Sequence, residues 1–279
     1  MASENKSAGE TALRVQGMRK VYSRRSGMWK RVQVCAVDGV DFEIGKGKTL
    51  ALVGSSGSGK STVARCVTRL ERPDAGEIWL GDENIARLDS GELRKYRPRL
   101  QMVFQDPSTS INPRFSAEQV IEEPLLILSN ENRDFRQHRA RELMKEVGLA
   151  PEWAERRATN FSGGQQQRLA IARALALEPE IVVLDEALSA LDLSTQAQIA
   201  NLLIELQVAR GLSYLLISHD IAFVARFADA IAVMSAGMIV EQGATEAIVS
   251  APQHPATKAL LESATASQKS LDRVLGAHA

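Results

Sequence analysis

Residues 54–62 read GSSGSGKST and match the pattern G-x-x-x-x-G-K-[ST], which surrounds a phosphate chain. The glycines let backbone N–H groups wrap around a phosphate, and the start of the following helix adds partial positive charge. We expect Lys60 to reach the β- and γ-phosphates of a nucleotide and the Ser61 hydroxyl to bind Mg²⁺. The alternative is an ordinary glycine- and serine-rich turn, but an apolar run before the motif and a helical pattern after it favour a phosphate loop.

Two adjacent carboxylates, Asp185 and Glu186, close the apolar run EIVVL. Such a strand ends at the edge of an open α/β sheet where ligands bind, and adjacent acids there are costly unless a metal ion or water uses them. We expect Asp185 to hold the Mg²⁺ shell and Glu186 to orient and polarise the attacking water. Solvated acids are common at strand ends, so this interpretation depends on the phosphate loop in the same chain.

Gln105 and His219 are isolated polar residues that follow two further apolar runs, LQMVF and SYLLIS. An isolated glutamine or histidine at a strand end is more often structural than catalytic. Because both runs are expected to reach the same sheet edge as Glu186, we expect both side chains to sense the γ-phosphate and the attacking water. Gln105 is also an expected Mg²⁺ ligand, together with Ser61 and Asp185.

The segment NFSGGQQQR at 160–168 predicts a helix start of unusual composition. Ser162 and Gln165 match a capping box, in which each side chain accepts a hydrogen bond from a backbone N–H at the helix start. That box does not explain Gly163 and Gly164, because glycine in a helix costs roughly 1 kcal/mol relative to alanine. Backbone that must approach another group closely accepts this cost, and the free N–H groups of a helix start suit an anion. The segment is therefore a candidate for a second phosphate contact.

Apolar runs and helical patterns alternate along the chain, which predicts the elements that position these residues. The runs TLALVG, EIVVLDE and SYLLISHD are typical of parallel strands buried on both faces. Helical patterns at 60–72, 163–178 and about 194–210 separate or follow them. The alternation predicts an α/β sandwich with a parallel core sheet.

Three other regions complete the predicted architecture. VCAVDGVDFEI and GEIWLGDENI alternate apolar and polar residues, which predicts an antiparallel β-subdomain near the N-terminus. Residues from about 107 to 178 contain helical patterns without a strand between them, which predicts an inserted helical subdomain. Residues 231–243 predict a hairpin, followed by a polar tail with one helical piece near 255–263.

The composition indicates a globular protein without a dedicated nucleic-acid surface. The chain has 279 residues, 44% of them hydrophobic, which is enough for a sizeable core. Its 34 basic and 34 acidic residues balance, whereas nucleic-acid binders usually carry a basic excess. Cys35 and Cys66 have neither metal-ligand spacing nor a disulfide framework, and neither a secretory signal nor an uncharged membrane-spanning run is evident. We expect a cytosolic protein with a flexible tail at residues 1–12.

In order along the chain, GSSGSGKS, Gln105, FSGGQ, VVLDE, SALD (189–192) and His219 resemble the motifs of ABC-transporter ATP-binding subunits. The tail IVEQGATEAIVSAPQHPATKALL is similar to that of the oligopeptide, dipeptide and nickel importer group, and SGGQ is similar to the second ATPase of such systems. The resemblance covers residues from about 13 to 262. It implies a P-loop NTPase sandwich, with an ABC ATPase domain at 13–250 and an importer-type tail at 251–279.

The resemblance also implies an activity and its partners. The activity is ATP hydrolysis, with Mg²⁺ as cofactor, coupled to substrate import at the cytoplasmic face of the inner membrane. The implied partners are a second ATPase subunit (homologous or identical), two membrane permeases and an extracytoplasmic substrate-binding protein, and no nucleic acid. Substrate selectivity is expected to lie in the permeases and the binding protein.

The resemblance further assigns residues to the nucleotide. Tyr22 matches the aromatic residue that stacks on adenine, with Trp29 as the alternative. The segment from Ser162 and the SALD motif with Asp192 are implied to face the ATP of the partner subunit, so that two nucleotides lie between two chains. The residues expected at the nucleotides are Tyr22, Gly54, Ser55, Ser56, Gly57, Ser58, Gly59, Lys60, Ser61, Thr62, Ser162, Gly163, Gly164, Gln165 and Asp192.

Other protein classes with a phosphate loop fit the sequence less well. A repair or cohesin-like ATPase needs a coiled-coil or zinc-bearing insertion, a translation-factor relative carries two tandem cassettes, and a small-molecule kinase lacks FSGGQ and SALD. Within transport, an exporter ATPase or an importer of nickel or another small solute is the alternative. Ala256 replaces the usual tyrosine of the tail motif, and the absence of cysteines after Cys66 predicts no iron–sulfur centre.

Overall fold

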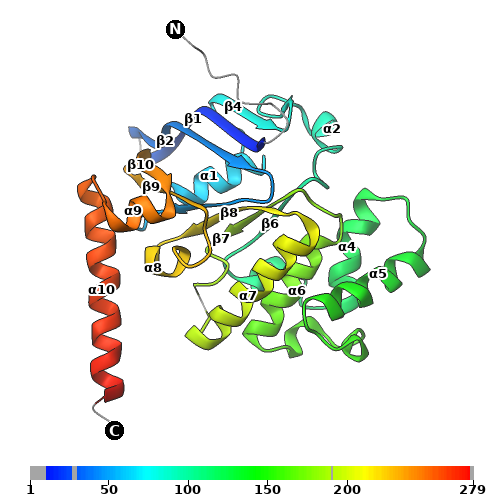
Figure 1. The fold of residues 1–279 in the computed structure, drawn as a ribbon. Coiled ribbons are helices and arrows are strands. Elements are labelled where there is room, and N and C mark those ends of the chain that lie inside the picture. Colours follow the sequence, from blue (N-terminus) through cyan, green and yellow to red (C-terminus); the bar gives the residue numbers. More distant parts are fainter. Residues whose placement is uncertain (1–10, 27–29, 190, 277–279) are drawn as a thin grey trace. The chain divides into compact units, whose positions relative to one another are not determined.

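The computed structural model describes residues 11–26, 30–189 and 191–276, which form two compact units (Figure 1). The first unit combines residues 1–87 and 215–279, and the second unit is residues 88–214. Most of the expected N-terminal tail lies outside the described residues, as do Trp29 and the alanine of SALD. Strand β1 begins at Thr11, two residues before the expected start of the ATPase domain at 13.

The first unit contains the antiparallel sheet that alternation near the N-terminus predicts. Its strand order is β2 (Lys30–Gly45), β1 (Thr11–Ser26), β4 (Ala75–Leu80) and β5 (Glu83–Asn84). The β1–β2 ladder continues to the pair of Ser26 with Lys30, which makes this region a hairpin.

The first unit also contains most of a mainly parallel set of strands, in the order β10, β9, β3 and β8. All five residues of β3 (Thr49–Val53) are buried, which explains its uninterrupted apolar run. It pairs in parallel with β9 (Ala230–Ser235), and β9 forms the predicted hairpin with β10 (Met238–Ala244). Strand β8 spans Ser213–Ser218.

The helices of the first unit differ in length from those expected. Helix α1 (Lys60–Val67) is shorter than the predicted 60–72, because Thr68 caps it and Arg69 turns to a left-handed φ of 53°. The other helices of this unit are α8 (Ile221–Val224), α9 (Thr245–Ser250) and α10 (Pro255–Gly276). Helix α10 continues well beyond the predicted piece at 255–263 and forms a long single helix (Figure 1).

The start of α10 is held on β10 by one carboxylate. Glu241 accepts hydrogen bonds from the backbone N–H groups of Gln253 (2.8 Å) and His254 (3.0 Å) and from the Thr257 hydroxyl. Burial opposes the charge of Glu241, but these hydrogen bonds outweigh it and lower the pKa of the carboxyl. The QHPAT segment of the tail motif is therefore an anchor between a strand and a helix.

The second unit contains a parallel strand pair and the helical insertion. The pair is β6 (Leu100–Val103) and β7 (Ile181–Asp185). The helices are α2 (Ser90–Leu93), α3 (Pro107–Ser110), α4 (Ala117–Leu128), α5 (Arg133–Glu146), α6 (Gly163–Leu175) and α7 (Leu193–Arg210), with short 3₁₀ turns η1 (Pro151–Trp153) and η2 (Ala158–Asn160). The predicted α/β class with an antiparallel sheet, parallel strands and inserted helices is confirmed.

An ion pair and one buried hydroxyl connect elements of the second unit. Arg210 at the end of α7 forms two hydrogen bonds of 2.5 Å with the Glu146 carboxylate of α5, and this contact raises the pKa of the guanidinium. The wholly buried Tyr214 donates its hydroxyl to the carbonyl of Leu203 in α7 (3.0 Å), and burial raises its pKa.

Among the described residues, no helix has both the length and the apolar character that a bilayer span requires.

Candidate functional site

The phosphate loop connects β3 to α1, and its glycines are required by close packing. A Cβ atom at Gly54 would lie 2.2 Å from the carbonyl oxygen of Met234 in β9. At Gly59, where φ is 107°, a Cβ atom would lie 2.2 Å from the carbonyl oxygen of Ala36 in β2. The loop is therefore seated against two strands and keeps its shape only with glycine at these positions.

Lys60 is the first residue of α1, and its side chain is only 4% exposed. Its ammonium donates to the carbonyls of Gly54 (2.8 Å) and Ser55 (2.9 Å) and lies 3.5 Å from the hydroxyl of the buried Ser58. The first turn of α1, all of it described, carries no acidic residue, and Gly59 supplies no side-chain cap. A buried cation and a helix start without carboxylates form a site suited to an anion.

Tyr22 of β1 is also in the first unit and is held at both its hydroxyl and its ring. Its hydroxyl donates to the Glu71 carboxylate, and the Lys20 ammonium lies 5.6 Å from the ring centroid. Partial burial and the Glu71 carboxylate raise the pKa of the phenol.

Ser55, Ser56 and His219 are exposed, and His219 follows β8 directly.

The second unit brings two of the predicted catalytic residues into contact. The Gln105 amide, two residues beyond β6, donates to a carboxylate oxygen of Glu186 at 3.1 Å. Asp185, the last residue of β7, is buried. The two acids are therefore in different surroundings, and Glu186 is the more accessible of them. Their roles at a nucleotide stay predictions.

Glu186 also has a strained backbone, which the sequence did not predict. Its φ is 47°, in the left-handed region that residues other than glycine rarely adopt and that costs about 1–3 kcal/mol. The backbone N–H and the hydroxyl of Ser189 both donate to the Glu186 carbonyl, at 3.0 and 2.8 Å. These two bonds stabilise the turn that presents the carboxylate.

The capping box at the start of α6 is present. The Ser162 backbone N–H donates to the Gln165 side chain (3.0 Å), and the Gln165 N–H donates to the Ser162 hydroxyl (3.4 Å). The surroundings of Gly163 and Gly164 differ in how much room they leave for a side chain. A Cβ atom at Gly164 would lie 2.6 Å from the Thr195 methyl group, whereas exposed Gly163 has only Leu191 nearby, at 3.9 Å. Gly164 is therefore required, at least in part, by its close approach to a side chain of α7. The expected contact of both glycines with a nucleotide stays a prediction.

Thr195 was missed by sequence reasoning, and it also holds Asp192. Asp192 caps α7 and accepts hydrogen bonds from the Thr195 N–H (2.9 Å) and hydroxyl (2.7 Å). These bonds lower the pKa of the Asp192 carboxyl. The starts of α6 and α7 thus meet at Thr195. In the sequence, only its position three residues after Asp192 could have indicated this role.

The predicted metal ligands are oxygen donors divided between the units. Ser61 belongs to the first unit, and Gln105 and Asp185 belong to the second. Within the part of the chain that the structure describes, no three His, Cys, Asp or Glu side chains gather as a metal cluster. A few oxygen donors suit Mg²⁺ that is carried largely by phosphates and water.

The sequence of the chain is similar to one known protein family and to individual members named as transport ATP-binding proteins. The ABC transporter domain family matches residues 37–189. A dipeptide transport ATP-binding protein of Haemophilus influenzae, DppF, is 46% identical over 250 residues, covering 89% of this chain and 76% of the relative. An oligopeptide transport ATP-binding protein of Bacillus subtilis, AppF, is 43% identical over 263 residues, covering 93% of this chain and 80% of the relative.

A solved structure is similar as well. The dimeric ATP-binding cassette MJ0796, in a post-hydrolysis state bound to ADP and phosphate, has a TM-score of 0.73 and 30% sequence identity. The match covers 84% of this chain and 98% of that chain.

The geometry of the phosphate loop gives a first prediction. Replacing Lys60 with alanine removes the cation that lies against the loop, so nucleotide affinity should fall about a hundredfold or more. Isothermal titration calorimetry with ATP measures this, with Lys46→Ala in the exposed turn after β2 as the matched control. Unchanged affinity in Lys60→Ala would mean that nucleotide binds elsewhere.

Proposed function

We propose that this chain, which belongs to the ABC transporter family, powers the import of dipeptides or oligopeptides. Membership of the family makes the chain an ATP-binding protein and an ATPase. The observation that carries the substrate class is the 46% identity, over 89% of this chain, with a subunit named for dipeptide transport. The oligopeptide relative supports the same class at 43% identity.

In this proposal the first unit supplies the groups that bind ATP. Backbone N–H groups of residues 54–59 wrap the phosphates, and Lys60 exchanges its carbonyl partners for the β- and γ-phosphates. A charge-assisted bond to phosphate is stronger than a bond to a neutral carbonyl, so the exchange favours binding. Tyr22 stacks on adenine, and its bond to Glu71 keeps the ring oriented before the nucleotide arrives.

Ser61, Asp185 and Gln105 are the residues that would hold Mg²⁺. All three offer oxygen donors, which this ion prefers. When bound, Mg²⁺ neutralises charge on the phosphate oxygens during transfer. Asp185 is buried at the end of β7, where it has little contact with solvent.

Glu186 orients the attacking water and accepts its proton. The Gln105 amide donates to a carboxylate oxygen of Glu186 and so helps to orient the carboxylate that acts on the water. The left-handed backbone at Glu186, held by Ser189, restricts the directions in which the carboxylate points. His219 donates to the γ-phosphate and stabilises the charge that develops there.

The start of α6 acts on a nucleotide bound to a second subunit. Phosphates on a loop such as 54–62 are covered on one side, and charge that develops on the γ-phosphate needs further donors. Ser162 offers a hydroxyl, and exposed Gly163 leaves the backbone accessible to a ligand. The dimeric state of the similar cassette MJ0796 supports pairing of two chains. ATP then closes the pair, and hydrolysis opens it.

The remaining partners follow from the importer assignment. Two permeases form the membrane path, and an extracytoplasmic binding protein delivers the peptide. The paired ATPase is either identical to this chain or homologous to it. The chain itself associates peripherally with the cytoplasmic face of the membrane, through the permeases.

The substrate class and the catalytic base are tested together in a transporter reconstituted with its permeases, paired ATPase and binding protein. Dipeptides or oligopeptides should stimulate ATP hydrolysis, and Glu186→Gln should keep ATP binding while lowering turnover at least about hundredfold. Phosphate release and filter-bound ATP report the two quantities. Stimulation by nickel and not by any peptide would contradict the substrate class. Parental turnover in Glu186→Gln would assign the base elsewhere.

Action across the pair is tested by a mixed complex in which only this chain carries Ser162→Arg. The bulky cation should block the site built with the partner's phosphate loop, while nucleotide still binds at this chain's Lys60. Site-specific hydrolysis is read by combining the variant with a phosphate-loop lysine substitution in one subunit at a time. Ser250→Arg, on the exposed end of α9, is the control. A lesion confined to the site of this chain's own loop would contradict the proposal.

A further inference from the structure

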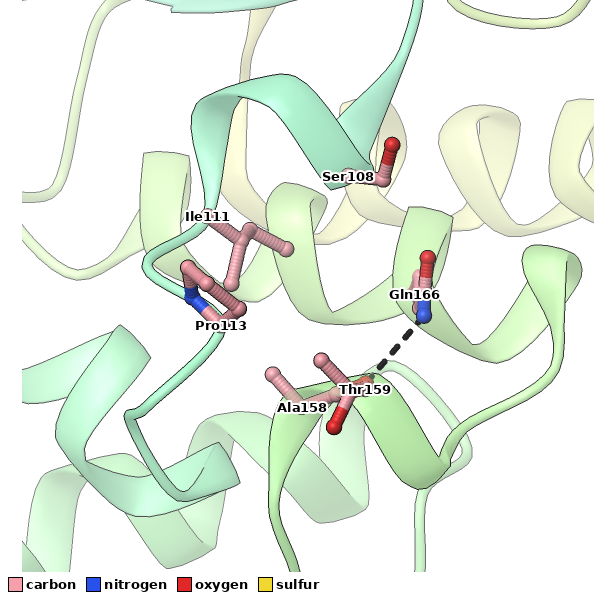
Figure 2. Close-up of a pocket in the computed structure, with 6 residues that line it drawn as sticks. All are labelled: Ser108, Ile111, Pro113, Ala158, Thr159 and Gln166. Carbon is pink, nitrogen blue, oxygen red and sulfur yellow. Dashed lines mark hydrogen bonds between the residues drawn. The ribbon is translucent and has the colours of Figure 1, made fainter.

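The main chain that leads into Ser162 is bonded by a side chain of the helix that Ser162 begins. Gln166, one turn into α6, donates its amide to the carbonyl of Ala158 at 3.2 Å (Figure 2). The same amide donates to the carbonyl of Phe161, also at 3.2 Å. The two carbonyls lie at the two ends of the turn that contains η2. The Gln166 backbone N–H donates to the Ser162 carbonyl at 2.8 Å. One residue thus joins the turn, the cap and the helix.

A second set of contacts also holds this turn. The Arg156 guanidinium lies 4.9 Å from the ring centroid of Phe161 and 5.5 Å from that of Trp153, and the two rings pack edge to face. Arg156 also donates to the Asn160 carbonyl. Because Phe161 is buried, the residue before Ser162 has little freedom to move alone.

The face of α6 that carries Gln166 also binds the segment that follows Gln105. Arg173, seven residues after Gln166 and thus on the same helix face, donates to the carbonyl of Ser110 at 3.0 Å. The Ala158 N–H donates to the Phe115 carbonyl at 3.0 Å, which joins the two segments directly. Both segments are therefore attached to one helix face and to each other.

Gln166 also lines a small cavity shared by these segments. The cavity has a volume of about 40 Å³ and is lined by Ser108, Ile111, Pro113, Ala158, Thr159 and Gln166. In Figure 2, Ile111 and Pro113 lie opposite the turn with Ala158 and Thr159, and the Gln166 amide points to that turn. Gln166 therefore faces both the turn before Ser162 and the segment after Gln105.

We propose that Gln166 is a positioning residue that sets the orientation of Ser162 and the start of α6, and that links this orientation to the segment after Gln105. This inference rests on the proposed action of Ser162 on the partner's nucleotide. Without the amide, the carbonyls of Ala158 and Phe161 lose a donor and the turn gains alternative conformations. The donors at the start of α6 are then misplaced relative to the γ-phosphate, which lowers turnover more than it weakens binding.

The test compares three substitutions at position 166 in this chain of the assembled transporter. Gln166→Met keeps the length of the side chain and removes both hydrogen bonds, so kcat for ATP hydrolysis should fall about tenfold or more with KM within about twofold. Gln166→Lys restores a donor to the same carbonyls and should recover most of the turnover. Gln166→Glu places a carboxylate, which only accepts hydrogen bonds, beside the carbonyls of Ala158 and Phe161. Its kcat should be no higher than that of Gln166→Met.

Two further measurements separate positioning from folding. ATP affinity of the full chain, by calorimetry, should be unchanged in Gln166→Met, and Gln198→Met on the exposed face of α7 serves as the matched control. In a Ser162→Ala background, Gln166→Met should lower kcat by less than about a further twofold, because both residues act through the same contact.

The outcomes distinguish this inference from the function on which it rests. The positioning role would be overturned if the effects of Ser162→Ala and Gln166→Met on kcat were fully additive. It would also be overturned if Gln166→Met and Gln166→Lys lost the same amount of kcat and both bound ATP more weakly. A normal kcat in Gln166→Met, with Ser162→Arg still blocking the partner's site, would overturn the inference alone. Failure of Ser162→Arg to block any site would overturn the proposed function instead.

Discussion

The burial of the Lys60 ammonium at the start of α1 is the constraint on which the first unit depends. A cation with this little solvent contact needs acceptors, and the loop supplies the carbonyls of Gly54 and Ser55. The loop can curve around the lysine only because it rests against Met234 and Ala36, where a side chain would collide with backbone. In the proposed function, phosphate replaces these carbonyls as the partner of the lysine, because a charge-assisted bond is the stronger one. In the proposed function, the lysine and its loop are therefore arranged for phosphate before phosphate is bound.

The second unit carries the proposed catalytic residues on turns that other residues stabilise. Glu186 has a left-handed backbone supported by Ser189, and Gln105 orients its carboxylate. The start of α6 is packed against Thr195 and is bonded through Gln166 to the preceding turn. Helix starts position donors well only when the chain entering them is fixed, and here side chains fix it. In the proposed function, hydrolysis depends on how these turns are held as much as on the reacting groups.

Much of this arrangement could be predicted from the sequence, and the exceptions have physical causes. The phosphate loop, the strand-end acids and the capping box are local patterns, in which neighbouring residues carry the signal. The left-handed φ of Glu186 and the contact of Gly164 with Thr195 depend on packing between elements, which no local pattern records. The predicted extents of α1 and α10 were wrong because Arg69 turns the chain early and the polar composition after 263 concealed a continuing helix.

The central claim is that the start of α6 contacts a nucleotide held by another subunit. Hydrogen exchange of the backbone amides at 163–165, followed by mass spectrometry in the assembled Glu186→Gln transporter, measures this contact directly. ATP should slow exchange at 163–165 and at 55–61, and a lysine substitution in the partner's phosphate loop should remove only the protection at 163–165. Equal protection of 163–165 by ATP in the isolated chain, at concentrations where it is monomeric, would contradict the claim.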